Sequence, residues 1–251
     1  MDHAHRFLDC PIAVVDVETT GLDPKSDRVI EVAVIHMQGG VVTERYSTLV
    51  NPQQALPEEV VKLTGITPEQ LAGAPPFAEV AFELHRRLQG RIFVAYNLAF
   101  DRAFLAEELL RTARELPTAL YLDPLVFVRE LHKGDGSKRL TAVAERLGIP
   151  LPNAHRAADD AEATGHVLYA LLAHLPELLG DLLLLQQQWE AQQKNEMAGW
   201  RGASREGIDQ GIGMAVDRGN ALGPAYLYGD DTDPVRAMFV HLPDAGAGRR
   251  A

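Results

Sequence analysis

The 251-residue chain has very little cysteine and a deficit of positive charge. Its single cysteine, Cys10, excludes an internal disulfide and suits a reducing cytosol. The formal net charge of −11 argues against long-range electrostatic attraction to polyanions. It does not exclude a nucleic-acid enzyme, because metal ions can neutralise part of a carboxylate cluster. Hydrophobic residues make up 46% of the chain, which is enough for a sizeable core.

Long apolar runs are missing as well. The stretch richest in leucine, residues 181–185, stops at Gln186 and is far too short to cross a bilayer. The first ten residues contain no apolar segment of the kind that signal peptides carry. We therefore expect a soluble, cytoplasmic protein that does not contact a membrane.

The order of the expected elements predicts an α/β fold. Strand patterns open the chain, and Gly39-Gly40 reads as a hairpin turn between two of them. After Pro57 helices and short strands alternate, which favours a mixed sheet flanked by helices. The expected strands are 12–18, 28–37, 41–50, 92–96 and 119–122, and the expected helices are 57–63, 77–88, 100–114, 125–131, 140–147 and 157–175.

The character of the chain changes after Pro176. A helix rich in Gln and Glu is expected at 178–198, with Trp189 and Trp200 packing this helix. The remainder is rich in Gly, Asp and Pro, with hints of strands at 226–228 and 238–242. We therefore predict a catalytic domain at 1–176 and a C-terminal appendage at 177–251. A chain ending near Pro176 is expected to fold, and the appendage is expected to serve self-association or a protein partner.

Two carboxylates lie two residues apart at the end of the first expected strand. Side chains of a strand alternate between faces, so Asp16 and Glu18 point the same way. Neighbouring carboxylates repel each other and lose solvation unless a cation lies between them. Oxygen ligands favour hard ions such as Mg²⁺ or Mn²⁺. The pair therefore indicates a cation site if further acidic residues join it.

Two later segments supply such acidic residues. Asp101 falls in the first turn of a helix for which Asn97 is the expected N-cap, and it borders the apolar face. In the helix that follows residue 156, Asp160 points toward the buried face and Asp159 toward a more exposed flank. His155 can meet Asp160 only if it lies on the loop before that helix. Asp123, at the end of a strand, is expected to cap a helix.

The motifs VVDVETTG at 14–21, YNLAFD at 96–101 and HRAADD at 155–160 stand in a characteristic order and at characteristic separations. They resemble the three motifs of the DEDDh exonucleases, a group that includes the proofreading (epsilon) subunit of bacterial DNA polymerase III. The resemblance covers residues 11–175. It implies an RNase H-like fold with a mixed five-stranded sheet, and removal of nucleoside monophosphates from 3′ ends.

The resemblance also implies roles for individual residues. The metal ligands would be Asp16, Glu18, Asp101 and Asp160, holding two divalent cations, Mg²⁺ or Mn²⁺, with His155 as the general base. The segment 63–67 resembles the family's nucleotide pocket, with Thr64 where His is more frequent, and Tyr96 stands where the second motif usually begins with His. The expected substrate-binding residues are Thr19, Thr20, Gly21, Leu22, Thr64, Tyr96, Asn97 and Phe100.

The leading interpretation is thus a metal-dependent 3′–5′ exonuclease acting on nucleic-acid 3′ ends, with DNA favoured over RNA. An RNA-trimming 3′–5′ exoribonuclease is the alternative within the same class. A catalytically silent nucleic-acid-binding or scaffold module is the alternative of another class. The complete set of acids and the histidine weigh against the silent module, because nothing else would require so costly an acidic cluster.

Overall fold

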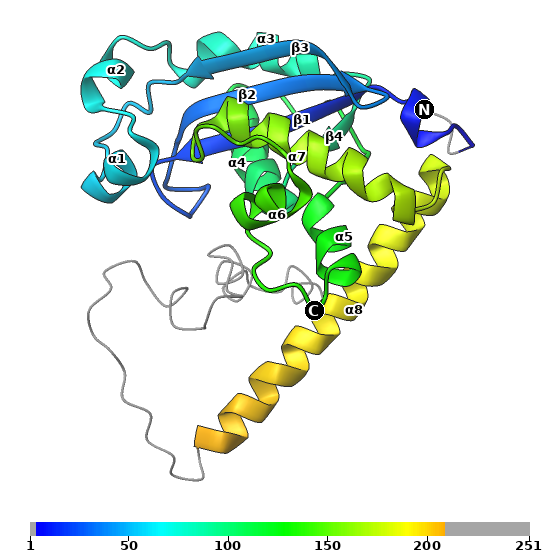
Figure 1. Cartoon of the computed structure of the whole chain (residues 1–251). Helices are drawn as coiled ribbons and strands as arrows, with labels where there is room; N and C mark the ends of the chain where they lie inside the picture. Colours follow the sequence, from blue (N-terminus) through cyan, green and yellow to red (C-terminus); the bar gives the residue numbers. More distant parts are fainter. Residues whose placement is uncertain (1–3, 209–251) are drawn as a thin grey trace, which may run out of the picture.

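The computed structural model describes residues 4–208, with 197–208 described only as backbone. The strand hints at 226–228 and 238–242, and the side chain of Trp200, therefore lie outside the described part. Figure 1 shows a sheet with helices packed around it and one long helix, α8 (Leu179–Ile208), that runs away from the sheet. None of the helices within residues 4–208 has the length and apolar character needed to span a bilayer.

Within the described residues the sheet has five strands, as predicted, and their order is β3-β2-β1-β4-β5. The central strand pairs antiparallel with β2 and parallel with β4, while β2–β3 is antiparallel and β4–β5 is parallel. Continuous apolar runs build β1 and β2 because both faces of these strands are covered. The strand bounds are β1 Ile12–Thr19, β2 Val29–Gln38, β3 Val41–Leu49, β4 Ile92–Val94 and β5 Tyr121–Leu122.

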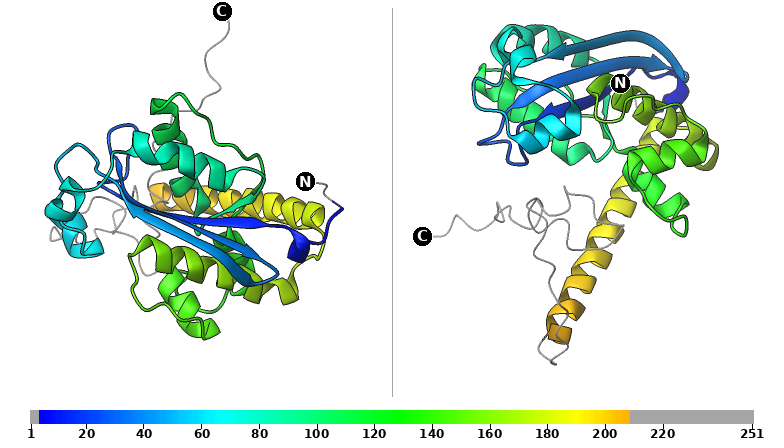
Figure 2. Two further views of the ribbon diagram at one scale, coloured as in Figure 1. Left: turned by 90° about the horizontal axis from the view of Figure 1, so that it is seen from above. Right: turned by 60° about the vertical axis from the view of Figure 1, so that its left-hand side comes forward.

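Helices cover both faces of the sheet, as the view from above in Figure 2 shows. One core lies between the sheet and α3 and α4, and the other lies between the sheet and α5, α6, α7 and the start of α8. Most helix bounds match the predicted ranges closely, but α4 begins two residues early. The bounds are α1 Glu58–Thr64, α2 Pro68–Ala72, α3 Phe77–Leu88, α4 Leu98–Arg111, α5 Pro124–Leu131, α6 Leu140–Leu147 and α7 Ala157–Leu171.

Local signals fixed several turns as expected. Gly39 and Gly40 have φ values of 59° and 81° in the hairpin between β2 and β3, a conformation that glycine adopts without strain. Thr67 begins α2 with a capping box, in which its hydroxyl accepts the Gln70 amide and the Gln70 side chain accepts the Thr67 amide. These features are local, so the sequence alone predicts them well.

The first part of α8 packs against the helices on one face of the sheet. Leu179 and Leu182 are fully buried in the same core as Phe127 of α5. Trp189 packs edge-on against Phe127, with 6.1 Å between ring centroids, so its predicted packing role is confirmed. The domain boundary at Pro176 stays a prediction, and these contacts show how closely the two predicted parts are joined.

Gly165 allows α7 to lie close to the sheet. A Cβ atom at this position would lie 2.2 Å from Met37 Sδ and 3.1 Å from Val14 Cγ2. Both neighbours are buried in β2 and β1. The approach of α7, which carries Asp160, therefore depends on the missing side chain.

We expect Gly165→Ala to lower the free energy of unfolding by about 1–3 kcal/mol, the usual cost of overpacking. The better helix propensity of alanine offsets only about 1 kcal/mol of this. Urea unfolding measures the difference. In a Met37→Ala background the same substitution should cost less, because the clash is relieved. An equal cost in both backgrounds would contradict this account of the packing.

Candidate active site

β1 presents Asp16 and Glu18 on the sheet face that α7 covers. Their neighbours Ile12 and Val14, at the same side-chain period, belong to the core beneath α7, whereas Val15 and Val17 belong to the other core. The predicted common face is therefore present. Both acids lie near the end of the strand, beyond the last paired residues of β4.

Asp101 reaches this cluster from the first turn of α4. Because β4 pairs with β1 only as far as Val14, the backbone amide of Val17 has no strand partner on that side. Asp101 Oδ1 accepts this amide at 3.0 Å, and the carboxylate is buried. One hydrogen bond thus fixes a predicted ligand of α4 between the two predicted ligands of β1.

Asp160 and His155 complete the cluster from the start of α7. Asp160 is buried and its Oδ2 accepts the His155 amide at 2.8 Å, while Asp159 bonds outward to Asn153. His155 lies on the loop before α7, as predicted, in a left-handed conformation with φ 66°. One potential ligand atom each from Glu18, His155 and Asp160 lies within 4.8 Å of the others. The structure therefore brings together all five predicted catalytic residues.

The electrostatics of the cluster reflect its crowding. Burial, and then repulsion by Asp101, Asp160 and Glu18, raises the pKa of Asp16 well above its ordinary value. Burial and the charge of Asp160 raise the pKa of Glu18 to about 8. Burial also raises the pKa of Asp101, against the opposing Val17 hydrogen bond, and raises the pKa of Asp160 to about 6. Such a site favours a cation, which would relieve this repulsion.

The imidazole of His155 shows the opposite shift. Its side chain is exposed, yet the surrounding protein desolvates it enough to lower the pKa below the ordinary value of histidine. A lowered pKa keeps the imidazole neutral at pH 7, so that it can accept a proton.

An ion pair that the sequence analysis missed fixes the loop of His155. Glu31 of β2 is buried, accepts two hydrogen bonds from the Arg156 guanidinium at 2.9 and 3.1 Å, and accepts the Ala157 amide at 3.2 Å. Glu31 stands directly opposite Glu18 in the register of β1 and β2. The sequence does contain a sign of this ion pair, because Glu31 is the only acidic residue within the apolar run of β2.

The segment Thr19–Leu22, predicted to touch the terminal nucleotide, is shaped by internal hydrogen bonds. Thr19 Oγ1 donates to the Gly21 carbonyl at 2.6 Å, and Thr20 Oγ1 accepts the Arg28 amide and the Gln54 side chain at 3.0 and 2.7 Å. A Cβ at Gly21 would lie 2.4 Å from Asp27 Oδ2, so a larger residue there would displace the Asp27 carboxylate. Leu22 is 45% exposed, so it is the side chain of this segment that is open to contact.

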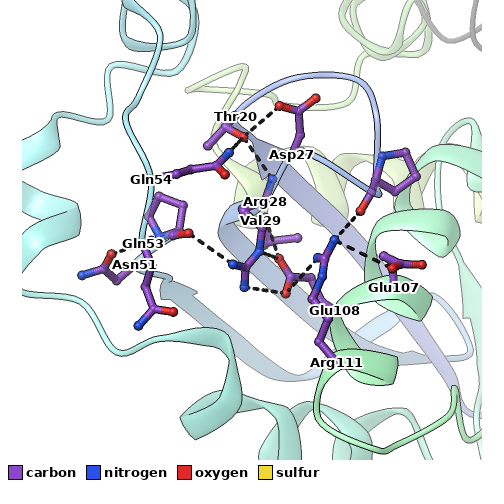
Figure 3. Close-up of polar contacts among 12 residues, drawn as sticks. Thr20, Asp27, Arg28, Val29, Asn51, Gln53, Gln54, Glu107, Glu108 and Arg111 are labelled. Carbon is purple, nitrogen blue, oxygen red and sulfur yellow. Dashed lines mark hydrogen bonds and ion pairs between the residues drawn. The ribbon is translucent and has the colours of Figure 1, made fainter.

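A buried ion pair, shown in Figure 3, supports that segment from below. Glu108 of α4 is almost fully buried and accepts two hydrogen bonds from Arg28 at 2.7 and 2.9 Å, together with the Val29 amide at 3.2 Å. Arg111 lies 3.4 Å from the same carboxylate. Arg28 also donates to the Pro52 carbonyl. The pair thereby joins the start of β2, α4 and the segment after β3.

The remaining predicted substrate-binding residues are placed as follows. Thr64 donates its hydroxyl to the Val60 carbonyl and accepts the Ile66 amide, so this side chain serves the turn after α1. Tyr96 donates its hydroxyl to the Lys138 carbonyl. Phe100 packs on Phe104 with 4.8 Å between ring centroids. None of these contacts tests a role in substrate binding, which stays a prediction.

Asn97 is the N-cap residue of α4, as predicted, and has a left-handed conformation with φ 68°, but its side chain does not supply the capping hydrogen bond. Asp123 takes that role, since its carboxylate accepts the amides of Asn97 and Leu98 at 2.9 and 3.0 Å. The same carboxylate accepts the Leu125 amide and caps α5, as predicted. The cap of α4 comes from a distant strand, so local sequence could not reveal it.

Comparisons with known proteins agree with this geometry. The model of the RNase T exonuclease family matches residues 13–168. The chain is 37% identical over 166 residues to the 3′–5′ exonuclease DinG of Bacillus subtilis (strain 168), covering 66% of this chain and 18% of DinG. It is 37% identical over 164 residues to the PolC-type DNA polymerase III of Oceanobacillus iheyensis, covering 65% of this chain and 12% of the polymerase. It thus spans less than a fifth of these relatives.

Solved structures share the fold. The zinc-bound complex of Escherichia coli exonuclease I with single-stranded DNA superimposes with a TM-score of 0.61 at 22% identity, covering 66% of this chain and 41% of that chain. The predicted RNase H-like fold with a mixed five-stranded sheet is therefore confirmed.

We expect the metal-free protein to lose stability as the pH rises. The carboxylate of Glu18 has a folded-state pKa of about 8, whereas an unfolded glutamate titrates near 4.3, so the folded state binds more protons between these values. The free energy of unfolding should therefore fall from about pH 4.5 to pH 8 and level off above that. Asp16→Asn should make the fall shallower and raise metal-free stability at pH 8 by about 1.4 kcal/mol, one pKa unit of relief. Thermal unfolding in EDTA measures both effects.

The contrary result would be a melting temperature that is flat or rising between pH 5 and 8 in EDTA. Added Mn²⁺ or Mg²⁺ provides the control, because a bound cation should remove most of the fall.

We expect Glu108→Gln to destabilise the protein by about 3 kcal/mol, because it leaves the Arg28 charge without its buried partner. The half-buried Glu107, one residue before it, gives the matched control, and Glu107→Gln should change stability by less than about 1 kcal/mol, because its carboxylate lies 3.8 Å from Arg111 and stays accessible to water. Urea unfolding of the two variants compares them. Equal effects would contradict the structural role assigned to Glu108.

Proposed function

The chain belongs to the RNase T exonuclease family, and from this premise we propose that it is a metal-dependent 3′–5′ exonuclease that releases nucleoside monophosphates from the 3′ ends of DNA. The observation that carries the proposal is the convergence of four carboxylates and one histidine from three separate elements. β1 supplies Asp16 and Glu18, α4 supplies Asp101, and the start of α7 supplies Asp160 and His155.

The donor set fits divalent cations. All four carboxylates offer oxygen ligands. Without a metal ion, burial and repulsion raise the pKa of Glu18 and Asp160, so a positive charge at this site is favourable. We propose that Asp16, Glu18, Asp101 and Asp160 hold two ions, Mg²⁺ or Mn²⁺. When bound, such a pair supplies an activated water and stabilises the leaving 3′ oxygen.

His155 then acts as the general base in this proposal. Its exposed, neutral imidazole can accept the proton of the attacking water at Nδ1 or Nε2. Asp160 holds the backbone of His155 by the 2.8 Å hydrogen bond, and the pair Glu31–Arg156 holds the start of α7 beside it. The base is therefore positioned by its main chain, while its ring stays accessible to substrate.

The choice of DNA rests on the relatives. DinG is named a 3′–5′ exonuclease and the PolC relatives are DNA polymerases, while the exonuclease I structure contains single-stranded DNA. We propose single-stranded 3′ ends as the substrate and the cytoplasm as the place of action. A polymerase, another protein or a second copy of the chain is the proposed partner of the C-terminal appendage, and light scattering of the full chain tests self-association.

The decisive experiment follows 5′-labelled DNA and RNA oligonucleotides of the same sequence, in Mg²⁺ and in EDTA. We expect a ladder that shortens from the 3′ end of the DNA in Mg²⁺, no products in EDTA, and none with Asp16→Asn. Faster shortening of the RNA would favour the exoribonuclease. Binding of the DNA and RNA oligonucleotides without cleavage of either one would favour the silent nucleic-acid-binding module.

We expect His155→Ala to lower the turnover number by a factor on the order of 10²–10⁴, the usual contribution of a general base. Its affinity for Mn²⁺, measured by calorimetry, should stay near that of the unsubstituted protein. His166 lies in α7, and its Nε2 atom is 3.8 Å from Glu162 Oε1. His166→Ala therefore serves as the control and should retain activity. If His155→Ala loses Mn²⁺ binding and excess Mn²⁺ restores its rate, His155 is a ligand instead.

A further inference from the structure

A glutamine side chain of α8 completes the open edge of the sheet. β5 is one of the two edge strands, so within residues 4–208 the backbone groups that face away from β4 have no strand partner. Gln186 Oε1 accepts the Asp123 amide at 2.8 Å, and Gln186 Nε2 donates to the Tyr121 carbonyl at 3.4 Å. A primary amide carries the same donor and acceptor as a peptide group, so Gln186 replaces a missing strand at this point.

The hydrogen bonds of Gln186 lie in a buried site. Gln186 is only 6% exposed, and Gln193, two turns further along α8, is equally buried and donates to the Val126 carbonyl at 3.0 Å. By contrast, Gln187 and Gln188 are exposed. Because water does not reach the edge there, loss of the amide would leave two backbone groups of the strand end unsatisfied.

Asp123, which Gln186 holds, controls the start of α4. Its carboxylate accepts the amides of Asn97 and Leu98, so the first turn of α4 is anchored to the end of β5. Asn97 is left-handed at φ 68°, a conformation that costs a residue other than glycine on the order of 1–3 kcal/mol and persists only where its surroundings enforce it. The two hydrogen bonds that the amides of Asn97 and Leu98 donate to Asp123 help to hold this conformation.

The first turn of α4 carries Asp101, three residues after Leu98. Asp101 must reach the Val17 amide of β1 at 3.0 Å to stand beside Asp16 and Glu18. A shift of this turn would therefore move one proposed metal ligand against the other two. A contiguous series of buried hydrogen bonds thus runs from α8 through Asp123 to the catalytic cluster.

We propose that Gln186 is a positioning residue for the nuclease reaction, and that the first part of α8 consequently belongs to the catalytic unit although it lies beyond the predicted boundary at Pro176. The kinetic part of the proposal rests on the proposed function. The structural part, the coupling of Gln186 to the first turn of α4, does not.

The kinetic test uses Gln186→Met, which keeps the length of the side chain and removes both hydrogen bonds. We expect the turnover number to fall about 10- to 100-fold, as displacements of about 1 Å do, while KM for a DNA oligonucleotide changes little. Gln188→Met is the matched control on the exposed face and should keep full activity. Leu182→Ala removes apolar packing of α8 and keeps the Gln186 amide, and its turnover number should fall less than that of Gln186→Met at a similar loss in melting temperature.

Amide hydrogen exchange of the metal-free protein, without nucleic acid, tests the structural part. In Gln186→Met the amides of Asn97 and Leu98 should lose protection that Gln188→Met retains. In the unsubstituted protein, the amides of Asp123, Asn97 and Leu98 should open together, with one free energy and one denaturant dependence. This second measurement remains decisive even if Gln186→Met does not fold.

Two outcomes would overturn the proposal. In the first, the Asp123 amide exchanges with a lower opening free energy than the amides of Asn97 and Leu98, which stay protected. The second is Leu182→Ala losing as much turnover as Gln186→Met at equal melting temperature, since the effect would then be general destabilisation. Failure of the proposed function looks different, because the protein would lack nuclease activity while the exchange results still held.

Discussion

Repulsion among four carboxylates at the end of β1 is the constraint on which the rest of the structure depends. Burial makes their charges costly, and the charge of Asp160 raises the pKa of both Asp16 and Glu18 further. Left to local preferences, such groups would turn apart toward water. The fold prevents this by placing each acid on a different rigid element or strand position and by anchoring those elements to one another.

The anchors are themselves buried polar contacts outside the cluster. Glu31 binds Arg156 and so fixes the start of α7, while Glu108 binds Arg28 and joins α4 to the start of β2. Asp123 fixes the other end of the same helix. Buried pairs of this kind add little net stability compared with apolar residues of the same size. Their value here is orientation, because each one constrains an element that carries a catalytic residue or shapes the loop beside it.

The sequence alone predicted the sheet, most helices and the convergence of the five residues that we propose to be catalytic. Strand alternation placed Asp16 with Glu18, helical spacing turned Asp160 inward, and the motif order connected them. Asn97 was predicted correctly as the N-cap position of α4, but the sequence did not reveal that the hydrogen-bond acceptor there is Asp123, 26 residues further along the chain. Gln186 escaped notice for the same reason, since its partners depend on the docking of α8. Contacts between distant segments decide these positions, and no local pattern records them.

Backbone amides that no neighbouring strand pairs explain why the Asp101 and Gln186 side chains can join separate elements of the fold. β4 ends at Val94, so β1 exposes the Val17 amide that a longer β4 would have paired. β5 lies at an edge of the sheet, so the Asp123 amide just after it faces away from β4 and has no neighbouring strand among the described residues. Asp101 fills the first gap at Val17, and Gln186 fills the second at Asp123. A ladder of peptide groups would have satisfied the same amides but could not have delivered a carboxylate to the cluster. The early end of β4 and the open edge at β5 are therefore part of how the active site is built.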